Sequence, residues 1–504
     1  MQQRTPDTKA YQRVVAVFKK HKKGITLSDV AAGTGLGLHE VKALVPAAAD
    51  EYSGRLEVTG SGEILYSFPH GFSSRYRGLI PACKRGFSAF KRHGAAVLTF
   101  LFKAWIMVML VGYFLLFIAI ALAALVLSIA AKNNRQGGGS GAGLSFGIFH
   151  LIIRMWFYSE LFNAASGRGA WGGGGRWGSA PPPKKNRRPM HKAIFSFIFG
   201  DGDPNSDRET IEKKEFIAYL RRQRGVVSLP ELMILTGQNP QMAESYIMRL
   251  CAEFGGTPEV TEEGTIVYRF EEILYSSAKD AQQSSAGIST LYKKPRSFSA
   301  NPQKMNFWFS VINGVNLLFG GYFLHSAATV GHFLPVVVDG GLQIPAEVPG
   351  IYGMVYSFLL IAEINPLPII SIGLGLVPLL FSAFFWLIPA LRWYFLKKEN
   401  EKIRTDNFRG LFFGRVWASP DNFKPAAFDP REDQSRPGDV AAAKNSALKE
   451  IGAYSTPQVS IDEGRNEVFA FTELRREKDA LAKYRRGVDV SKTSTGDTVF
   501  DSNA

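Results

Sequence analysis

Three long stretches of the chain contain no Lys, Arg, Asp or Glu, and they span residues 104–131, 306–338 and 364–391. About 20 apolar residues are enough to cross the hydrocarbon core of a bilayer as a helix, so each stretch is long enough for a membrane span. Uncharged runs of this length are rare in water-soluble domains. The pattern therefore predicts an integral membrane protein.

A fourth apolar stretch, 144–162, follows the first one through the Gly-rich sequence NNRQGGGSGAG. It carries Arg154 and Glu160. We expect it to cross back as the second arm of a hairpin, with a helix lying at the membrane interface as the alternative.

The final apolar region, 351–396, is divided by EINPLP, which predicts a half-inserted piece followed by a full crossing. We therefore expect four crossings, with three or five as the alternatives. Glu363 stands at the division. A carboxylate at membrane depth is costly and often functional, whereas one at the interface needs no function, and we favour the interfacial position.

Between the apolar stretches, shorter patterns predict compact modules. In the first module, residues 9–21 carry an apolar stripe with helical spacing, 26–35 predict a short helix closed by glycine, and 38–52 predict a third helix in spite of Pro46. Residues 55–68 alternate apolar and polar side chains around a Gly-bearing turn. This alternation predicts a two-stranded hairpin.

The same pattern returns 202 residues later. EVTGSGEILYSF at 57–68 is matched without a gap by EVTEEGTIVYRF at 259–270. Thr34 and Gly35 likewise fall on Thr236 and Gly237. Chance does not keep such a register, so we interpret the match as an internal repeat.

A weaker match to the second hairpin lies near the C-terminus. TPQVSIDEGRNEVFAFTEL at 456–474 resembles the second hairpin if two single-residue insertions are allowed, and a helical pattern at 440–451 precedes it. We interpret this region as a partial third copy. A generic amphipathic hairpin is the alternative.

Three helices followed by a two-stranded wing is the element order of a winged-helix domain, which both copies resemble. Winged helices that bind DNA present Arg, Lys, Asn and Gln from the third helix to the bases. Here the third helices offer few such side chains and several acidic ones: Lys42 with Glu40, Asp50 and Glu51 in the first copy, and Gln241 and Arg249 with Glu244 and Glu253 in the second. The second wing, EVTEEG, carries three acidic residues that repel phosphate. The pattern favours modules that bind protein.

The predicted fold class is mainly α, with integral membrane helices, two cytoplasmic winged-helix (α+β) domains and a partial third copy. The expected order along the chain is a first winged-helix domain (1–70), a basic juxtamembrane segment (71–94), a transmembrane hairpin (95–163), a flexible Gly/Pro-rich basic linker (164–190), the GDGDPN turn with the second winged-helix domain (191–275), a linker (276–304), a transmembrane region (305–397) and a cytoplasmic tail with the partial hairpin (398–504).

Charge sets the expected orientation. The chain has 59 basic and 44 acidic residues, a net charge of +15, and the basic side chains crowd the flanks of the apolar stretches. Flanking Lys and Arg stay in the cytoplasm, so we expect a bacterial inner-membrane protein with both termini and its soluble domains on that side. A nucleic-acid-binding arm is the alternative for these clusters. Two cysteines, Cys83 and Cys251, and eight scattered histidines support neither a disulfide framework nor a zinc site.

One polar stretch has metal-ligand spacing. Within FIFGDGDPNSDRETIEKKEF, oxygen-bearing side chains stand where an EF-hand calcium loop has its ligands, at Asp201, Asp203, Asn205, Asp207 and Glu212. The sixth and eighth positions, Ser206 and Arg208, depart from that loop. The favoured alternative is a turn in which Ser206 caps the following helix with Glu209 as its capping-box partner.

The same stretch carries a family resemblance. FGDGDPN, with the helix after it and the post-membrane sequence KKENEKIRTDNFR, is similar to an uncharacterised family of multi-span membrane proteins of cyanobacteria and plastids. The similarity begins near the second soluble domain. The resemblance implies a multi-span membrane architecture with soluble domains, and it implies no biochemical mechanism.

These features favour a membrane-anchored scaffold or adaptor that binds an unknown protein partner through its winged-helix domains, with the lipid bilayer as its other partner. No nucleophile–base pair, phosphate loop or ligand cluster is visible in the sequence, so we expect neither an enzyme nor a cofactor, calcium being the one candidate. The alternatives are a membrane-tethered nucleic-acid-binding regulator, and a transporter or channel component. Nucleic acid is the less favoured partner.

Overall fold

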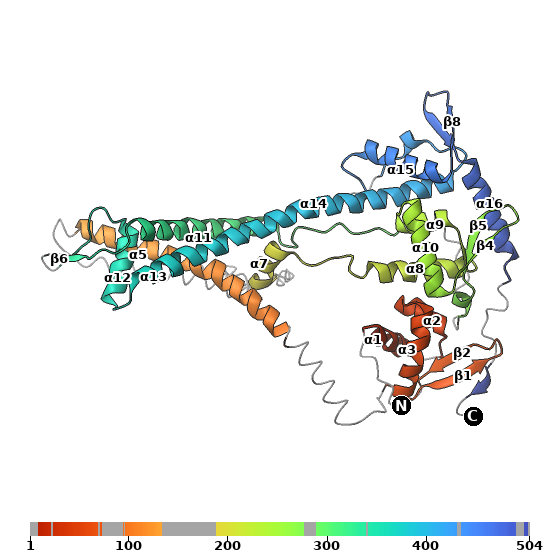
Figure 1. Cartoon of the computed structure of the whole chain (residues 1–504), viewed down its shortest axis with the longest axis horizontal. Helices are drawn as coiled ribbons and strands as arrows, with labels where there is room; N and C mark the ends of the chain where they lie inside the picture. The colour runs from red at the N-terminus through yellow and green to blue at the C-terminus, as the bar shows by residue number, and fades with distance from the viewer. Residues whose placement is uncertain are drawn as a thin grey trace, which may run out of the picture. The chain divides into compact units, whose positions relative to one another are not determined.

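The computed structural model describes residues 9–21, 24–68, 71–72, 94, 96–133, 188–276, 289–338, 341–430, 435–489 and 498–501. It is mainly helical, with a few small sheets (Figure 1). The chain divides into two compact units. We call one the modular unit, made of residues 1–85, 203–296 and 397–504, and the other the membrane unit, made of residues 86–202 and 297–396.

The modular unit contains two parts with matching elements. The first has three helices and a hairpin: α1 (Lys9–Lys20), α2 (Leu27–Thr34), α3 (Leu38–Glu51), β1 (Arg55–Thr59) and β2 (Ile64–Ser67). The second has the same order with additions: α8 (Arg208–Arg222), β3 (Val226–Val227), α9 (Leu229–Thr236), α10 (Pro240–Phe254), β4 (Thr257–Val260), β5 (Ile266–Arg269) and η2 (Glu272–Leu274). The bounds of α9 and β5 are those of α2 and β2 shifted by 202 residues.

The two short helices are bounded by the same local chemistry. Asp29 accepts a hydrogen bond from the backbone N–H of Thr26 before α2, and Glu231 accepts one from Ser228 before α9. These carboxylates satisfy N–H groups that have no partner within the helix. Each helix ends at a glycine in the left-handed conformation, which a side chain would strain: Gly35 (φ 71°) and Gly237 (φ 70°).

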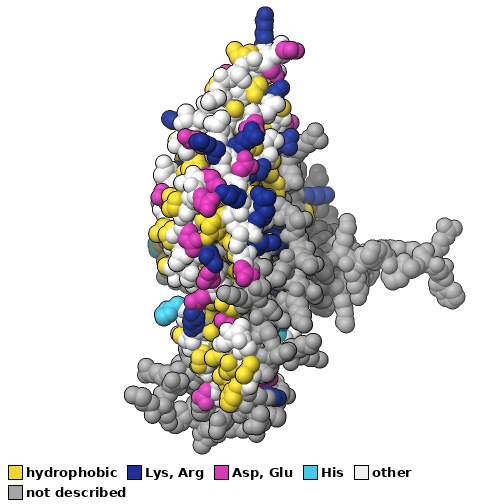
Figure 2. Space-filling view, turned by 90° about the vertical axis from the view of Figure 1, so that its right-hand side faces the viewer, with side chains coloured by type: hydrophobic (Ala, Val, Ile, Leu, Met, Phe, Trp, Pro, Cys, Tyr) yellow, Lys and Arg dark blue, Asp and Glu magenta, His cyan; other side chains and the backbone are white. Residues whose placement is uncertain are grey.

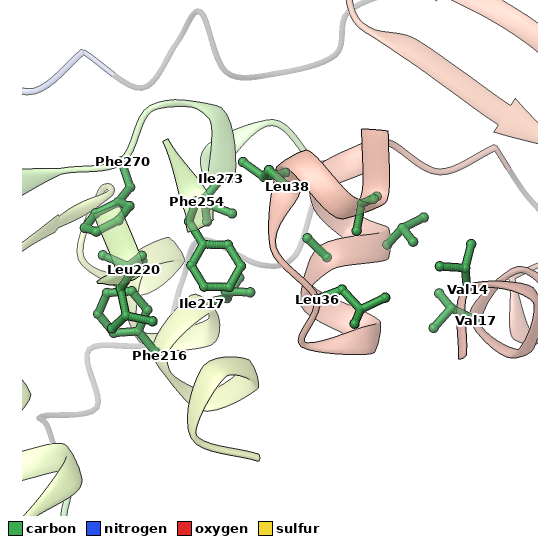
Figure 3. Close-up of a cluster of buried hydrophobic side chains, with 14 of the residues drawn as sticks. Val14, Val17, Leu36, Leu38, Phe216, Ile217, Leu220, Phe254, Phe270 and Ile273 are labelled. Atoms are coloured by element: carbon green, nitrogen blue, oxygen red, sulfur yellow. The ribbon is translucent and has the colours of Figure 1, made fainter. Parts of the chain in front are cut away.

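One hydrophobic core joins the two parts (Figure 3). The cluster contains side chains from both, among them Val14, Val17, Leu36 and Leu38 from the first part and Phe216, Ile217, Leu220, Phe254, Phe270 and Ile273 from the second. Next to this core, Arg221 of α8 pairs with Asp29 of α2 at 3.0 Å, and both side chains are nearly buried. The two parts are therefore packed as one body.

The C-terminal part of the modular unit contains the hairpin expected at 456–474. Its elements are α15 (Val440–Tyr454), β8 (Gln458–Ile461), β9 (Glu467–Ala470), α16 (Thr472–Gly487) and β10 (Thr498–Asp501). Its apolar side chains share a second core with the second part, including Phe471 and Leu474 with Met233 and Ile234. The last strand, β10, pairs with β1 of the first part, a contact that the sequence did not predict. Whether the hairpin is a third copy stays a prediction.

The membrane unit carries the apolar stretches. Three helical regions among the described residues are long and apolar enough to span a bilayer: Ala96–Ile129, Gln303–Thr329 and Pro366–Ala418. They correspond to the three uncharged runs of the sequence. The stretch 144–162 lies outside the described residues, so the number of crossings stays a prediction.

The described elements of this unit include η1 (Val108–Gly112), α5 (Tyr113–Asn133), α7 (Met190–Phe199), α11 (Gln303–Thr329), β6 (Val336–Val338), β7 (Gly341–Gln343) and α12 (Gly350–Ile361). The final apolar region breaks at EINPLP as expected. It continues there as α13 (Pro366–Pro368), η3 (Ile369–Leu376) and α14 (Val377–Ala418), and the residues of α14 from Lys397 on belong to the modular unit.

The helix α7 departs from the expected domain boundary. Residues 191–202, expected with the second winged-helix domain, belong to the membrane unit. The reason is the apolar face of α7, because Ile194 and Phe197 share a buried cluster with Phe309 of α11 and Phe385 of α14.

Polar side chains join the membrane helices where their hydrogen-bond ladders are irregular. The η1 and η3 segments are π-helices, in which some carbonyls lose their usual partner. Asn316 of α11 donates to the carbonyl of Leu110 in η1 at 2.8 Å, and Tyr113 donates to the carbonyl of Gly373 in η3 at 2.8 Å. In a bilayer such carbonyls need a partner from the protein, which these two side chains provide.

Candidate functional site

The five residues with calcium-loop spacing do not all belong to one unit. Asp201 is in the membrane unit, where its carboxylate accepts hydrogen bonds from Ser196 Oγ at 2.6 Å and from the backbone N–H of Ala300 at 2.7 Å. Asp203, Asn205, Asp207 and Glu212 are in the modular unit.

In the modular unit, the carboxylates of Asp203 and Glu212 pair with arginines of the same chain. Asp203 forms an ion pair with Arg296, whose hydrogen bond holds the pKa of Asp203 below its usual value. Glu212 pairs with Arg208 at 2.6 Å, one turn back on the same helix. Within the described parts of the chain, no group of three or more His, Cys, Asp and Glu side chains is arranged to hold a metal ion.

The expected capping of α8 by Ser206 is wrong. The helix begins at Arg208 with Asp207 at the N-cap position, and no side chain there makes a capping hydrogen bond. Polar side chains of the GDGDPN turn instead contact an extended segment about 90 positions further along the chain: Asn205 contacts Lys294, and Asp203 pairs with Arg296.

Residues 289–296, which we call the strap, form an extended segment held by asparagine side chains. Each of three asparagines both accepts from the backbone N–H and donates to the backbone carbonyl of one strap residue, at 2.8–2.9 Å: Asn205 with Lys294, Asn407 with Lys293, and Asn400 with Arg296. A side-chain amide has a donor and an acceptor side by side, so it satisfies an extended backbone as a neighbouring strand does. The region 276–304, expected as a linker, is thus a clamped segment over 289–296.

The spacing of the clamps matches the geometry of the two segments. Asn400 and Asn407 lie seven residues apart on α14, which is two turns of one face and roughly 10 Å of rise. Their partners Lys293 and Arg296 lie three residues apart, and three extended residues also span roughly 10 Å. The strap therefore runs antiparallel to α14 in a single register.

Charged groups reinforce this register. Lys293 pairs with Asp406 at 2.7 Å, and Arg296 pairs with Glu399 at 3.0 Å as well as with Asp203. Arg208 donates to the carbonyl of Tyr292 at 2.8 Å. The GDGDPN turn and the post-membrane sequence KKENEKIRTDNFR, noted in the sequence only as family signatures, together hold the strap. Sequence reasoning missed this because the partners lie 89 to 114 positions apart.

The third helices of the two parts expose few unpaired cations. Lys42 of α3 pairs with Glu272 at 2.7 Å. Arg249 of α10 lies over the ring of Tyr246 and within 3.5 Å of Glu209. The exposed face of α10 instead includes two methionines, Met242 and Met248, which are 56% and 52% exposed.

Both hairpins engage other segments of the same chain. The edge of β1 is paired with β10, with Glu57 opposite Asp501 and Val58 opposite Phe500. Helix α16 lies against the second hairpin, where Lys483 bonds to Glu262 and Glu263 at 2.7 Å each. On the same side Arg485 pairs with the buried Glu231 of α9 at 2.6 Å.

The surface charge is mixed in sign. Figure 2 shows Lys and Arg side chains interspersed with Asp and Glu on the face that it presents. Nucleic-acid-binding surfaces gather basic side chains into a patch or stripe. On this face, the net charge of +15 therefore does not form such a patch.

The described residues define a mainly helical membrane protein whose modular unit contains packed helix-and-hairpin parts. The chain is similar to an uncharacterised chloroplastic protein, At5g03900, of Arabidopsis thaliana, with 24% identity over 408 residues that cover 79% of this chain and 70% of the relative. No family model and no solved structure matches the chain.

Proposed function

We propose that the protein is a membrane-anchored scaffold or adaptor, without catalysis, whose modular unit binds a protein partner through two winged-helix modules derived from an internal repeat. The matching element bounds at a shift of 202 residues and the common strand register of the two hairpins support the repeat. The order of three helices and a wing supports the winged-helix assignment.

One observation supports the proposal most directly: both wings contact other segments of the same chain. The first wing accepts β10 as an added strand, and the second accepts α16 through its acidic side chains. Strand addition at a sheet edge is a common way of binding peptides. A wing with Glu259, Glu262 and Glu263 attracts basic protein segments and repels phosphate.

The exposed face of α10 is the surface that we assign to the partner. Methionine side chains adapt to varied apolar surfaces and are common at protein-binding sites. Met242 and Met248 stand on the helix where a DNA-binding winged helix carries base-reading polar side chains. This surface binds an apolar patch of the partner.

We further propose that both soluble modules and both termini lie in the cytoplasm beneath a bacterial inner membrane, because basic residues flank the spans. Reporter fusions at Gln3, Gln282 and Ala504 test this orientation. A reporter signal from the opposite side at Gln282 contradicts it.

The test of partner binding uses the full chain, purified from gently solubilised membranes. Met248→Asp is expected to lose a stoichiometric protein partner that the unmodified chain retains, whereas Lys449→Asp, at an exposed position of α15, retains it. In parallel, duplex DNA of varied sequence is expected to bind only weakly and without sequence preference at about 200 mM salt. Sequence-specific DNA binding at that salt would favour the membrane-tethered regulator instead.

A further inference from the structure

An open cavity of about 720 Å³ lies in the membrane unit, next to the break between α12 and α13. Its lining includes His332, Phe333, Tyr356, Leu360, Glu363 and Asn365. Apolar side chains beside it are strongly exposed, with Leu334 at 79% and Ile361 at 71%. Exposed apolar side chains of this kind offer a surface for the acyl tail of a lipid.

The backbone at Glu363 is unusual for its residue type. The end of α12 is closed by hydrogen bonds from the N–H of Glu363 to the carbonyl of Leu360 and from Ile364 to Leu359, both at 3.0 Å. This closure places Glu363 in the left-handed conformation, with φ 59°. Glycine is the usual residue at such a position, because a side chain there is strained.

Three other helices follow that rule, whereas α3 and α8 are followed by the left-handed residues Ser53 (φ 52°) and Arg224 (φ 58°). Helices α2, α9 and α10 each end at a left-handed glycine: Gly35, Gly237 and Gly255. A carboxylate at the C-terminal end of a helix is also unfavourable, because the helix dipole is negative there. Glycine at position 363 would remove both the backbone strain and the unfavourable interaction of the charge with the helix dipole. Glu363 also lines the cavity. A strained residue that lines a cavity indicates a function for its side chain, because strained residues cluster at functional sites.

The other lining groups define the chemistry of a ligand. The rings of Phe333 and Tyr356 are stacked, with centroids 4.3 Å apart, and His332 Nδ1 is 3.1 Å from the Tyr356 hydroxyl. The described residues that line the cavity include no Lys or Arg. A carboxylate beside aromatic rings, without a basic side chain, attracts a cation and disfavours an anionic head.

We propose that this cavity binds one membrane lipid that has an ammonium head, with Glu363 as the counter-ion and the apolar rim against the lipid tail. The site goes beyond the proposed adaptor function and does not depend on it, since it uses only residues of the membrane unit. It gives the unit a preference among the lipids of its bilayer.

The test uses the full chain in nanodiscs, with native mass spectrometry to count retained lipid. The bilayers are phosphatidylglycerol mixed with phosphatidylethanolamine, phosphatidylglycerol mixed with an uncharged glycolipid, and phosphatidylglycerol alone. The unmodified chain is expected to retain one phosphatidylethanolamine, and Glu363→Gln to reduce that retention at least about fivefold by removing the charge. Glu347→Gln, an exposed glutamate outside the cavity lining, is expected to leave it unchanged.

A second variant separates binding from folding. Glu363→Gly is expected to lose the lipid and at the same time to raise the Tm of the protein, because it removes the backbone strain and the unfavourable charge. Equal retention of the glycolipid by the unmodified chain would overturn the assignment of an ammonium head. Undiminished retention of phosphatidylethanolamine in Glu363→Gln would overturn the site.

Discussion

Asn407 and Lys293, 114 positions apart, exchange two hydrogen bonds of 2.8 Å, one in each direction, between the side-chain amide and the backbone of the strap. Asn407 is 2% exposed. A buried amide that is satisfied on both sides fixes one register of the strap, because any slip by one residue leaves buried polar groups without partners. Along the chain, the strap directly precedes the membrane unit, which resumes at Ser297.

The first prediction concerns this clamp. Asn407→Leu removes both hydrogen bonds and leaves the part-buried N–H and carbonyl of Lys293 without this partner, which we expect to cost about 1–3 kcal/mol of unfolding free energy. Tryptic cleavage after Lys293 and Arg296 is expected to become faster, whereas Lys294 precedes Pro295 and is not cleaved by trypsin. Asn445→Leu, at an exposed position of α15, is the control and should change neither quantity. Unchanged cleavage in Asn407→Leu would show that the strap does not depend on the clamp.

The second prediction concerns calcium. The carboxylates of Asp203 and Glu212 are paired with Arg296 and Arg208, so we expect millimolar calcium to leave the Tm of the full chain unchanged. Magnesium is the control for general ionic effects. A rise in Tm with calcium alone that disappears in Glu212→Gln would support the calcium loop at Asp201–Glu212 and show that calcium displaces the arginines.

Local periodicity predicted much of the fold. The helical stripe at Val14, Val15, Val17 and Phe18 and the alternation in 55–68 gave elements at the expected places, because helices and hairpins are specified by neighbouring residues. The uncharged runs likewise marked the three described spans.

The sequence could not predict contacts between distant segments. Asn400, Asn407 and Arg296 carry no local sign of a clamp, because the clamp exists only when α14 and the strap meet. The same holds for the pairing of β10 with β1 and for the cavity at Glu363, where the sequence indicated only a carboxylate at a break. Local reasoning found Glu363, since a charge within an apolar region is visible without a structure.

The third prediction concerns the ion pair between α16 and α9. Glu231 is 2% exposed and also accepts a hydrogen bond from the Tyr219 hydroxyl at 2.6 Å. Arg485→Met leaves its carboxylate buried without a cation, which we expect to cost roughly 3–5 kcal/mol of unfolding free energy. Arg485→Met combined with Glu231→Gln should recover most of this loss. Arg486→Met, at an exposed neighbour, serves as the control; a loss of similar size there would show that the effect is not specific to the ion pair.

The fourth prediction concerns the pH dependence of stability. Burial raises the pKa of Glu477 on α16 to about 7, with repulsion from Glu231 acting in the same direction and the hydrogen bond from Tyr454 opposing it. Tyr454 donates to the two carboxylate oxygens at 3.1 and 3.0 Å. The folded protein therefore holds the proton of this carboxyl over a pH range in which the unfolded chain has lost it.

The sign follows from proton linkage. Between the ordinary glutamate pKa of 4.5 and about 7, the folded state binds more protons than the unfolded state, so the unfolding free energy falls as the pH rises through this window. At about 1.4 kcal/mol for each pKa unit, the loss is at most about 3.5 kcal/mol. Glu477→Gln keeps an acceptor for Tyr454 and carries no charge. We expect it to raise the Tm more strongly near pH 8 than near pH 5, whereas Asp479→Asn, a 75% exposed neighbour, changes the Tm little at either pH. Equal shifts of Glu477→Gln at both pH values would mean that Glu477 is already ionised at the lower pH.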